Sequence, residues 1–152
     1  MVVGASFSCS FRDLPIDPAK LRNELPKIPT VGGLCIFEGI VRSENHGKRV
    51  VRLDYEAYET LALKEMQRIG TEAKERFGLA YSVQCHRTGS LEIGDIAVFI
   101  AAMAKHRHES FLGSRYIIDQ LKLRVPVWKK EYYDDRSHEW TRCHELHRRN
   151  DD

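Results

Sequence analysis

The sequence lacks the features of a membrane-spanning protein and of a secreted, disulfide-bonded one. No apolar run approaches the roughly 20 residues needed to cross a bilayer. The N-terminal residues carry no basic segment followed by an apolar one, so we expect no secretory signal. The four cysteines, Cys9, Cys35, Cys85 and Cys143, include no C-x-x-C pair. These absences favour a protein of the reducing cytoplasm without a disulfide framework.

Several catalytic and cofactor-binding motifs are also missing. The chain has no G-x-S-x-G, no P-loop and no G-x-G-x-x-G, so hydrolase, NTPase and dinucleotide-binding functions have no support. The possible metal ligands fall into two clusters. They are His106, His108 and Glu109 in one, and His138, Cys143, His144 and His147 in the other. Neither cluster has a known zinc spacing, and we predict no functional metal site.

The composition is that of one folded domain. A chain of 152 residues with 42% hydrophobic and 30% charged residues is typical of a single globular domain. The net charge of +2 is too small to indicate a nucleic-acid-binding protein from composition alone. We predict one domain over residues 1–140. Six of residues 141–152 are Arg, Asp or Glu, and two more are His, and we expect this charged tail to be mobile or to become ordered against a partner.

Hydrophobic periodicity predicts strands and helices mixed along the chain, an α+β protein. Strands are predicted over 7–12, 34–42, 50–58, 80–87 and 96–104, and a short extended segment over 127–132. Helices are predicted over 18–25, over 59–77, and over a third segment that ends near Leu123, shortly before Pro126. Gly39 inside a strand indicates a bulge. We expect the alternating strand at 50–58 to pair with the strand before it.

Basic side chains recur at the ends of these predicted elements. They are Arg42, His46, Lys48, Arg49, His106, Arg107, Lys122 and Lys129. Because the ends of neighbouring strands meet in space, such residues can line one pocket, and that pocket would suit a phosphorylated or carboxylate-bearing ligand. The alternative is a solvated positive surface, in which Lys122 only complements the C-terminal dipole of its helix.

Four stretches, in order along the chain, resemble a known family. They are GLCIFEGIVR at 33–42, TGSLEIGD at 88–95, AKHR at 104–107 and LKLRVPVWKKE at 121–131. Together they resemble the large catalytic subunit of molybdopterin synthase, the MoaE type. The match runs from about residue 5 to Trp140. The H-R element combined with K-x-R-x-P-x-W-K is specific.

The resemblance implies a fold, partners and a reaction. The fold is an α/β hammerhead with an additional antiparallel β subdomain. The family forms a homodimer in which each subunit binds one small ubiquitin-like sulfur carrier of the MoaD type, giving a heterotetramer. The carrier's C-terminal Gly-Gly, as a thiocarboxylate, delivers sulfur to cyclic pyranopterin monophosphate, and two rounds build the dithiolene of molybdopterin. No metal or organic cofactor is required, because the sulfur arrives on the carrier.

The resemblance also assigns site residues by position. Lys122 and Lys129 match the two active-site lysines of the family. We assign Lys122 to the thiocarboxylate terminus and to general acid–base work, and Lys129 to holding the pterin intermediate. Phe37 matches a wall position beside the carrier's tail.

Three further positions match the family's substrate-binding residues, which bind the phosphate and the pterin. They are Arg42, His106 and Arg107. The chain departs from the family after Trp140, where an arginine often reaches the neighbouring subunit. Here Arg142 and His144 follow the tryptophan, and either can fill that role.

A non-enzymatic function is the alternative: a basic α+β module that binds RNA, or one that docks a carrier protein for chemistry done elsewhere. The basic loop at 46–49 and the pair Lys129-Lys130 support it. The chain lacks the aromatic stacking platform of a sheet-based RNA reader, so we expect neither nucleic acid nor membrane as a partner.

Overall fold

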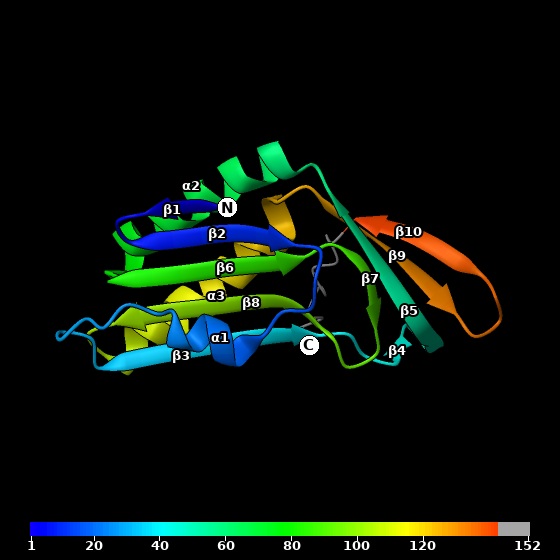
Figure 1. The fold of residues 1–152 in the computed structure, drawn as a ribbon, viewed down its shortest axis with the longest axis horizontal. Coiled ribbons are helices and arrows are strands. Elements are labelled where there is room, and N and C mark those ends of the chain that lie inside the picture. Colours follow the sequence, from blue (N-terminus) through cyan, green and yellow to red (C-terminus); the bar gives the residue numbers. More distant parts are fainter. Residues whose placement is uncertain (143–152) are drawn as a thin grey trace, which may run out of the picture.

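A computed structural model describes residues 1–142, which form two β-sheets and three helices (Figure 1). The first sheet holds five strands whose spatial order differs from their order in the chain. In spatial order they are β1 (Val2–Gly4), β2 (Phe7–Arg12), β6 (Tyr81–Arg87), β8 (Ile96–Ala104) and β3 (Gly33–Ile40). The pair β2 and β6 is parallel, and the other neighbours are antiparallel.

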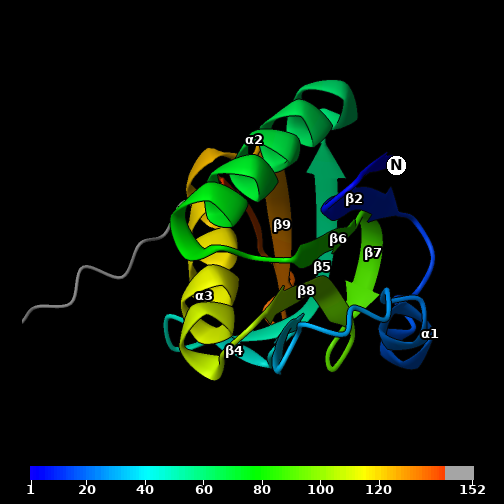
Figure 2. The same cartoon turned by 90° about the vertical axis from the view of Figure 1, so that its left-hand side faces the viewer.

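Helices cover both faces of this sheet. On one face, α2 (Glu59–Phe77) and α3 (Arg107–Arg124) lie side by side, and the short α1 (Pro18–Asn23) lies on the other (Figure 2). The strand β8 is therefore buried on both faces, with Ile100 in the core cluster under α2 and α3 and Phe99 in the cluster near α1. This double burial explains why its sequence is a continuous apolar run rather than an alternating one.

The second sheet is antiparallel and lies at one end of the first (Figure 1). Its strands follow the order β10 (His138–Arg142), β9 (Val127–Tyr133), β5 (Lys48–Ala57) and β4 (Glu44–Asn45), and β7 (Gly89–Glu92) also pairs with β5. The α+β class with an additional antiparallel subdomain is thus confirmed. The predicted helix at 59–77 is found with the same bounds, and the other long elements agree within a few residues.

One expected pairing is wrong. The strand β5 does not pair with β3; it pairs with β9, β7 and β4, while β3 pairs with β8. The register of β3 shifts between Gly39 and Ile40, as the bulge prediction expects, and the chain then leaves the first sheet. Alternation in a sequence tells which face of a strand is buried, and it does not tell which strand is its partner.

The end of the described chain bears on the predicted tail. Thr141 and Arg142 belong to β10, where they pair with Lys129 and Trp128. The rest of that tail lies outside the described residues, and so do Cys143, His144 and His147. Within residues 1–142 no helix is long and apolar enough to span a membrane, and no cluster of three or more potential metal-ligating side chains occurs in that range.

Candidate active site

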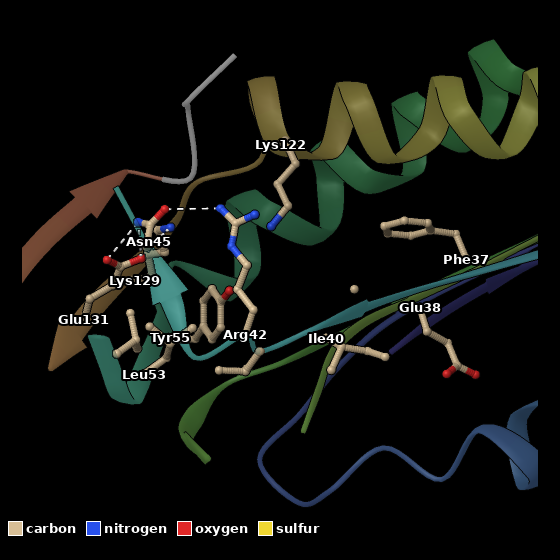
Figure 3. A pocket seen from close by; sticks show the side chains of 13 residues that line it. Phe37, Glu38, Ile40, Arg42, Asn45, Leu53, Tyr55, Lys122, Lys129 and Glu131 are labelled. Carbon is tan, nitrogen blue, oxygen red and sulfur yellow. Dashed lines mark hydrogen bonds and ion pairs between the residues drawn. The ribbon is translucent and has the colours of Figure 1, made fainter. Parts of the chain in front are cut away.

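A pocket of about 320 Å³ opens where the two sheets and the end of α3 meet (Figure 3). Its polar lining comes from five separate segments of the chain. These side chains are Arg42, Asn45, Tyr55, Lys122, Lys129 and Glu131, and Glu38 of β3 also lies at the pocket's edge. Phe37 and Ile40 of β3 form an apolar part of its wall and are 39% and 56% exposed. The pocket therefore combines three cations with an apolar, solvent-exposed side.

The break between α3 and β9 places the two lysines around this cavity. Lys122 lies in the last turn of α3, and Lys129 lies on β9. Pro126 cannot continue the helix, and Val125 before it takes extended dihedrals, φ −73° and ψ 127°. The chain thus turns from helix into strand between the two lysines. Figure 3 shows Lys122 and Arg42 pointing toward the same space from different elements, while Glu38 points away.

Lys129 is held by a buried carboxylate. Its Nζ lies 2.8 Å from Oε1 of Glu131, whose residue is only 2% exposed. Glu131 also accepts hydrogen bonds from Nδ2 of Asn45, at 2.9 Å to each oxygen, and from the Tyr133 hydroxyl at 2.7 Å. Burial raises the pKa of Glu131, but the hydrogen bonds from Lys129, Asn45 and Tyr133 outweigh burial and leave the pKa below its ordinary value. Glu131 is therefore ionised at neutral pH.

Arg42 follows β3 and is exposed on the pocket side. One of its Nη atoms donates to Oδ1 of Asn45 at 3.2 Å. A guanidinium carries five N–H donors in a planar fork that matches carboxylate and phosphate geometry. Arg42 can thus bind an anion through its other N–H groups while one of them stays hydrogen-bonded to Asn45.

A buried histidine lies behind the side of the pocket that Tyr55 lines. His86 of β6 is 1% exposed, and its ring stands edge-on to Tyr55 of the pocket, 5.1 Å between centroids. Burial and then the charge of Lys122 lower its pKa to about 3. Its Nδ1 lies 2.8 Å from the Arg87 carbonyl, which can only accept, so Nδ1 carries the proton and Nε2 is a bare acceptor. Within the described residues, Nε2 has no hydrogen-bond partner.

His86 is a residue that sequence reasoning missed. The sequence does contain a hint of it, because His86 is a polar residue within the predicted strand at 80–87, between Cys85 and Arg87. A histidine in an apolar strand is more often a satisfied core residue, and only the structure shows that it lies behind Lys122 and Tyr55.

The predicted site residues divide into two groups in space. Phe37, Arg42, Lys122 and Lys129 all line the pocket. His106 and Arg107 are exposed at the opposite, N-terminal end of α3, beside Gly33 at the start of β3. Lys122 is 15 residues further along the same helix than Arg107, which corresponds to about 22 Å at 1.5 Å per residue. One chain therefore does not bring His106 and Arg107 into its own pocket.

The fold and the pocket define a class of protein: an α+β domain with an added antiparallel sheet, and a cationic, two-lysine pocket for an anionic ligand at their junction. The chain belongs to the MoaE family, whose family model, described as MoaE protein, matches residues 11–124.

Individual relatives agree with this assignment. The chain is 46% identical over 106 residues to the molybdopterin synthase catalytic subunit of Pyrococcus abyssi, which covers 70% of this chain and 72% of the relative. A solved molybdopterin synthase from Staphylococcus aureus superimposes with a TM-score of 0.79 at 34% identity, over 86% of this chain and 94% of that one. A solved complex of subunits 1 and 2 of the Helicobacter pylori molybdopterin-converting factor shares the fold, with a TM-score of 0.72 at 22% identity over 88% and 89% of the two chains.

Proposed function

We propose that this chain is the catalytic subunit of a molybdopterin synthase. It transfers sulfur from the C-terminal thiocarboxylate of a small ubiquitin-like carrier to cyclic pyranopterin monophosphate, and so forms the molybdopterin dithiolene. The observation that carries this proposal is the pocket of a MoaE-family chain in which Arg42, Lys122 and Lys129 converge. A thiocarboxylate and a cyclic phosphate are both anions, and both are stabilised by cationic hosts.

The two lysines have different roles in this proposal. Lys129 is paired with the ionised Glu131, which holds its ammonium group in place and suits the binding of an anionic intermediate. The charge of Lys122 acts on the imidazole of His86, and together with burial it keeps that ring neutral. We assign Lys122 to the thiocarboxylate terminus and to proton transfer as the sulfur passes to the substrate and water replaces it on the carrier's terminal carbonyl carbon, which leaves as a carboxylate.

Arg42 and Phe37 serve the two reactants. Arg42 presents its exposed guanidinium to the substrate's phosphate or pterin. Phe37, together with Ile40, gives the carrier's tail an apolar wall to pass on its way to Lys122. A Gly-Gly terminus is narrow, since it has no side chains, and it fits such an entrance.

His106 and Arg107 require a second copy of the chain. They lie too far from the pocket of their own subunit, so we propose that a homodimer brings them to the substrate bound by its partner. Arg142, exposed at the end of β10, is a second candidate for a contact across the dimer. His144, the other candidate, lies outside the described residues.

The carrier is proposed as a separate small subunit of the MoaD type. The solved Helicobacter pylori complex supports this, because there two subunits of the molybdopterin-converting factor are bound to each other. Two carriers on a homodimer make a heterotetramer. We further propose that residues 1–140 act as one catalytic domain, that no resident cofactor is required, and that the protein works in the cytoplasm.

A reconstituted reaction tests the function. The protein is mixed with thiocarboxylated carrier and cyclic pyranopterin monophosphate, and molybdopterin is followed after oxidation to its fluorescent derivative. We expect product with the native chain, none above background with Lys122→Ala, and normal product with the exposed-lysine control Lys27→Ala.

The negative outcomes have different meanings. Carrier binding without product from the native chain would identify a docking subunit rather than an enzyme. Failure to bind any thiocarboxylated carrier would refute the proposed assembly. Normal product from a folded Lys122→Ala variant would remove Lys122 from the chemistry.

A further inference from the structure

One amide joins the anion-binding arginine to the buried carboxylate that holds Lys129. Asn45 accepts a hydrogen bond from Arg42 through Oδ1, at 3.2 Å, and donates through Nδ2 to both oxygens of Glu131, at 2.9 Å each. Glu131 in turn lies 2.8 Å from Nζ of Lys129. Two of the three cations of the pocket are therefore connected through Asn45.

This connection works in only one orientation of the amide. A guanidinium can only donate and an ionised carboxylate can only accept, so Oδ1 must face Arg42 and Nδ2 must face Glu131. A flipped amide would set oxygen against carboxylate and N–H against N–H. Aspartate has the same shape as asparagine but no N–H, and alanine has neither group. Asn45 is therefore the one side chain here whose two ends match opposite partners.

The local backbone holds Asn45 in place. It lies on the two-residue strand β4 and pairs with Lys48 of β5. The two residues between them, His46 and Gly47, have φ of 49° and 76°, as in a two-residue hairpin turn with both central residues left-handed. This tight turn directs Asn45 toward β9, 86 residues away in sequence from its partner Glu131.

We propose that Asn45 is a positioning residue for the reaction: its amide fixes the Glu131 carboxylate and the Arg42 guanidinium in one geometry, and so holds Lys129 where an anionic intermediate binds. The functional part of this inference rests on the proposed function. The structural part of the inference, that the Asn45 amide fixes the Glu131 carboxylate, does not depend on the proposed function.

The surroundings of Glu131 decide how its titration responds. Charged and titratable groups face it from each neighbouring element. Lys129 and Tyr133 on β9 contact it directly; Arg42 after β3, Tyr55 on β5 and Lys122 on α3 line the same pocket; Lys48 on β5 lies over the Tyr133 ring; and Glu139 is its cross-strand neighbour on β10. Glu139 is the only carboxylate of this described set, and it is exposed. The cations and donors therefore dominate, in agreement with the lowered pKa of Glu131.

The first experiment is a titration that needs no activity. The side-chain carboxyl carbons of glutamate are labelled with ¹³C, and the Glu131 resonance is assigned by its absence in Glu131→Gln. We expect its midpoint to move to higher pH in Asn45→Ala, which loses the donor, and further in Asn45→Asp, which adds a like charge. Asn23→Ala, at an exposed asparagine on α1, is the control and leaves the midpoint unchanged. An unchanged midpoint in both Asn45 variants overturns the proposal.

The second experiment measures the reaction against pH. We expect Asn45→Asp and Asn45→Ala to lower kcat by about ten- to a hundredfold, and to move the acid limb of the pH–rate profile upward in parallel with the Glu131 midpoint. Carrier affinity, measured by calorimetry, stays at the native value, whereas a collapsed pocket would weaken it. A shifted midpoint with native kcat would overturn the positioning role. A native chain that makes no product would refute the proposed function instead, and the titration would still decide whether Asn45 controls Glu131.

Discussion

The pocket has two walls that carry the same kind of side chain in opposite surroundings. On the wall made by β9 and β4, Lys129 lies within a charged network around Glu131, which accepts three sets of hydrogen bonds. On the wall made by α3, the positive charge of Lys122 acts on the neutral ring of His86, a buried side chain of β6 that does not itself line the pocket. The difference shows how one protein can give two lysines separate tasks: an ionised carboxylate holds the ammonium group of Lys129 in position, whereas the charge of Lys122 helps to keep the buried imidazole of His86 neutral.

Exchange of each lysine for arginine is expected to give the largest difference in activity between the two walls. Arginine keeps the positive charge and the donors but does not release a proton near neutral pH. General acid–base catalysis contributes about 10²- to 10⁴-fold, so we expect Lys122→Arg to lose activity on that scale. Lys129→Arg can still pair with Glu131, and we expect this variant to keep most of the activity. The measurement is the initial rate of molybdopterin formation for both folded variants. Equal losses would mean that the two lysines do the same work.

Removal of the carboxylate tests whether the charged wall also stabilises the fold. Glu131→Leu leaves Lys129 and the Asn45 amide without their buried partner, and breaking such a pair costs about 3 kcal/mol. The measurement is the free energy of unfolding in urea at neutral pH. Glu75→Leu, at an exposed position of α2, is the matched control and should change this free energy little. A stability equal to the native value would show that the network serves the site alone.

The buried imidazole of His86 should make the stability of the protein depend on pH in the acid range. The pKa of His86 is about 3 in the folded protein, against about 6.5 in the unfolded chain. Between these values the unfolded state binds more protons, so stability falls as the pH is lowered, by about 2 kcal/mol from pH 7 to pH 5. We expect His86→Asn to abolish this part of the pH dependence.

The control for that titration is His138→Asn, at an exposed histidine of β10, which should leave the dependence in place. Stability is measured by urea unfolding at each pH. The carboxylates with lowered pKa, such as Glu131 and Asp95, lose their contribution only below their ordinary pKa values near 4, so they do not mask the effect of His86.

Much of the fold follows from local sequence patterns. For the helix at 59–77 and the strand at 96–104 the sequence predicts the same bounds that the structure has, because each has a clear periodicity or a continuous apolar run. Four of the six predicted site residues line one pocket. Three of them, Arg42, Lys122 and Lys129, are cations near element ends, where the pattern and the family resemblance agree.

The structure added what no local pattern contains. The pairing of β5 with β9 rather than β3 brings Glu131 next to Asn45, and the strand β6 carries His86 behind Lys122. The contact between Glu131 and Asn45 cannot be inferred from the sequence. A glutamate in the segment after Pro126 and an asparagine in a polar loop are, by sequence alone, ordinary surface residues. The separation of His106 from Lys122 is likewise a consequence of the length of α3.

By itself the sequence determined which segments become helix or strand, where Pro126 ends α3, and which family the motifs resemble, because these depend on residues a few positions apart. Only the tertiary structure decided that Lys129 is held by a buried carboxylate and that the charge of Lys122 acts on a buried imidazole. Those environments come from contacts between distant segments, such as Asn45 with Glu131, whose partners are chosen by the packing of the two sheets. Burial and hydrogen bonding then set the charge of Glu131 and His86.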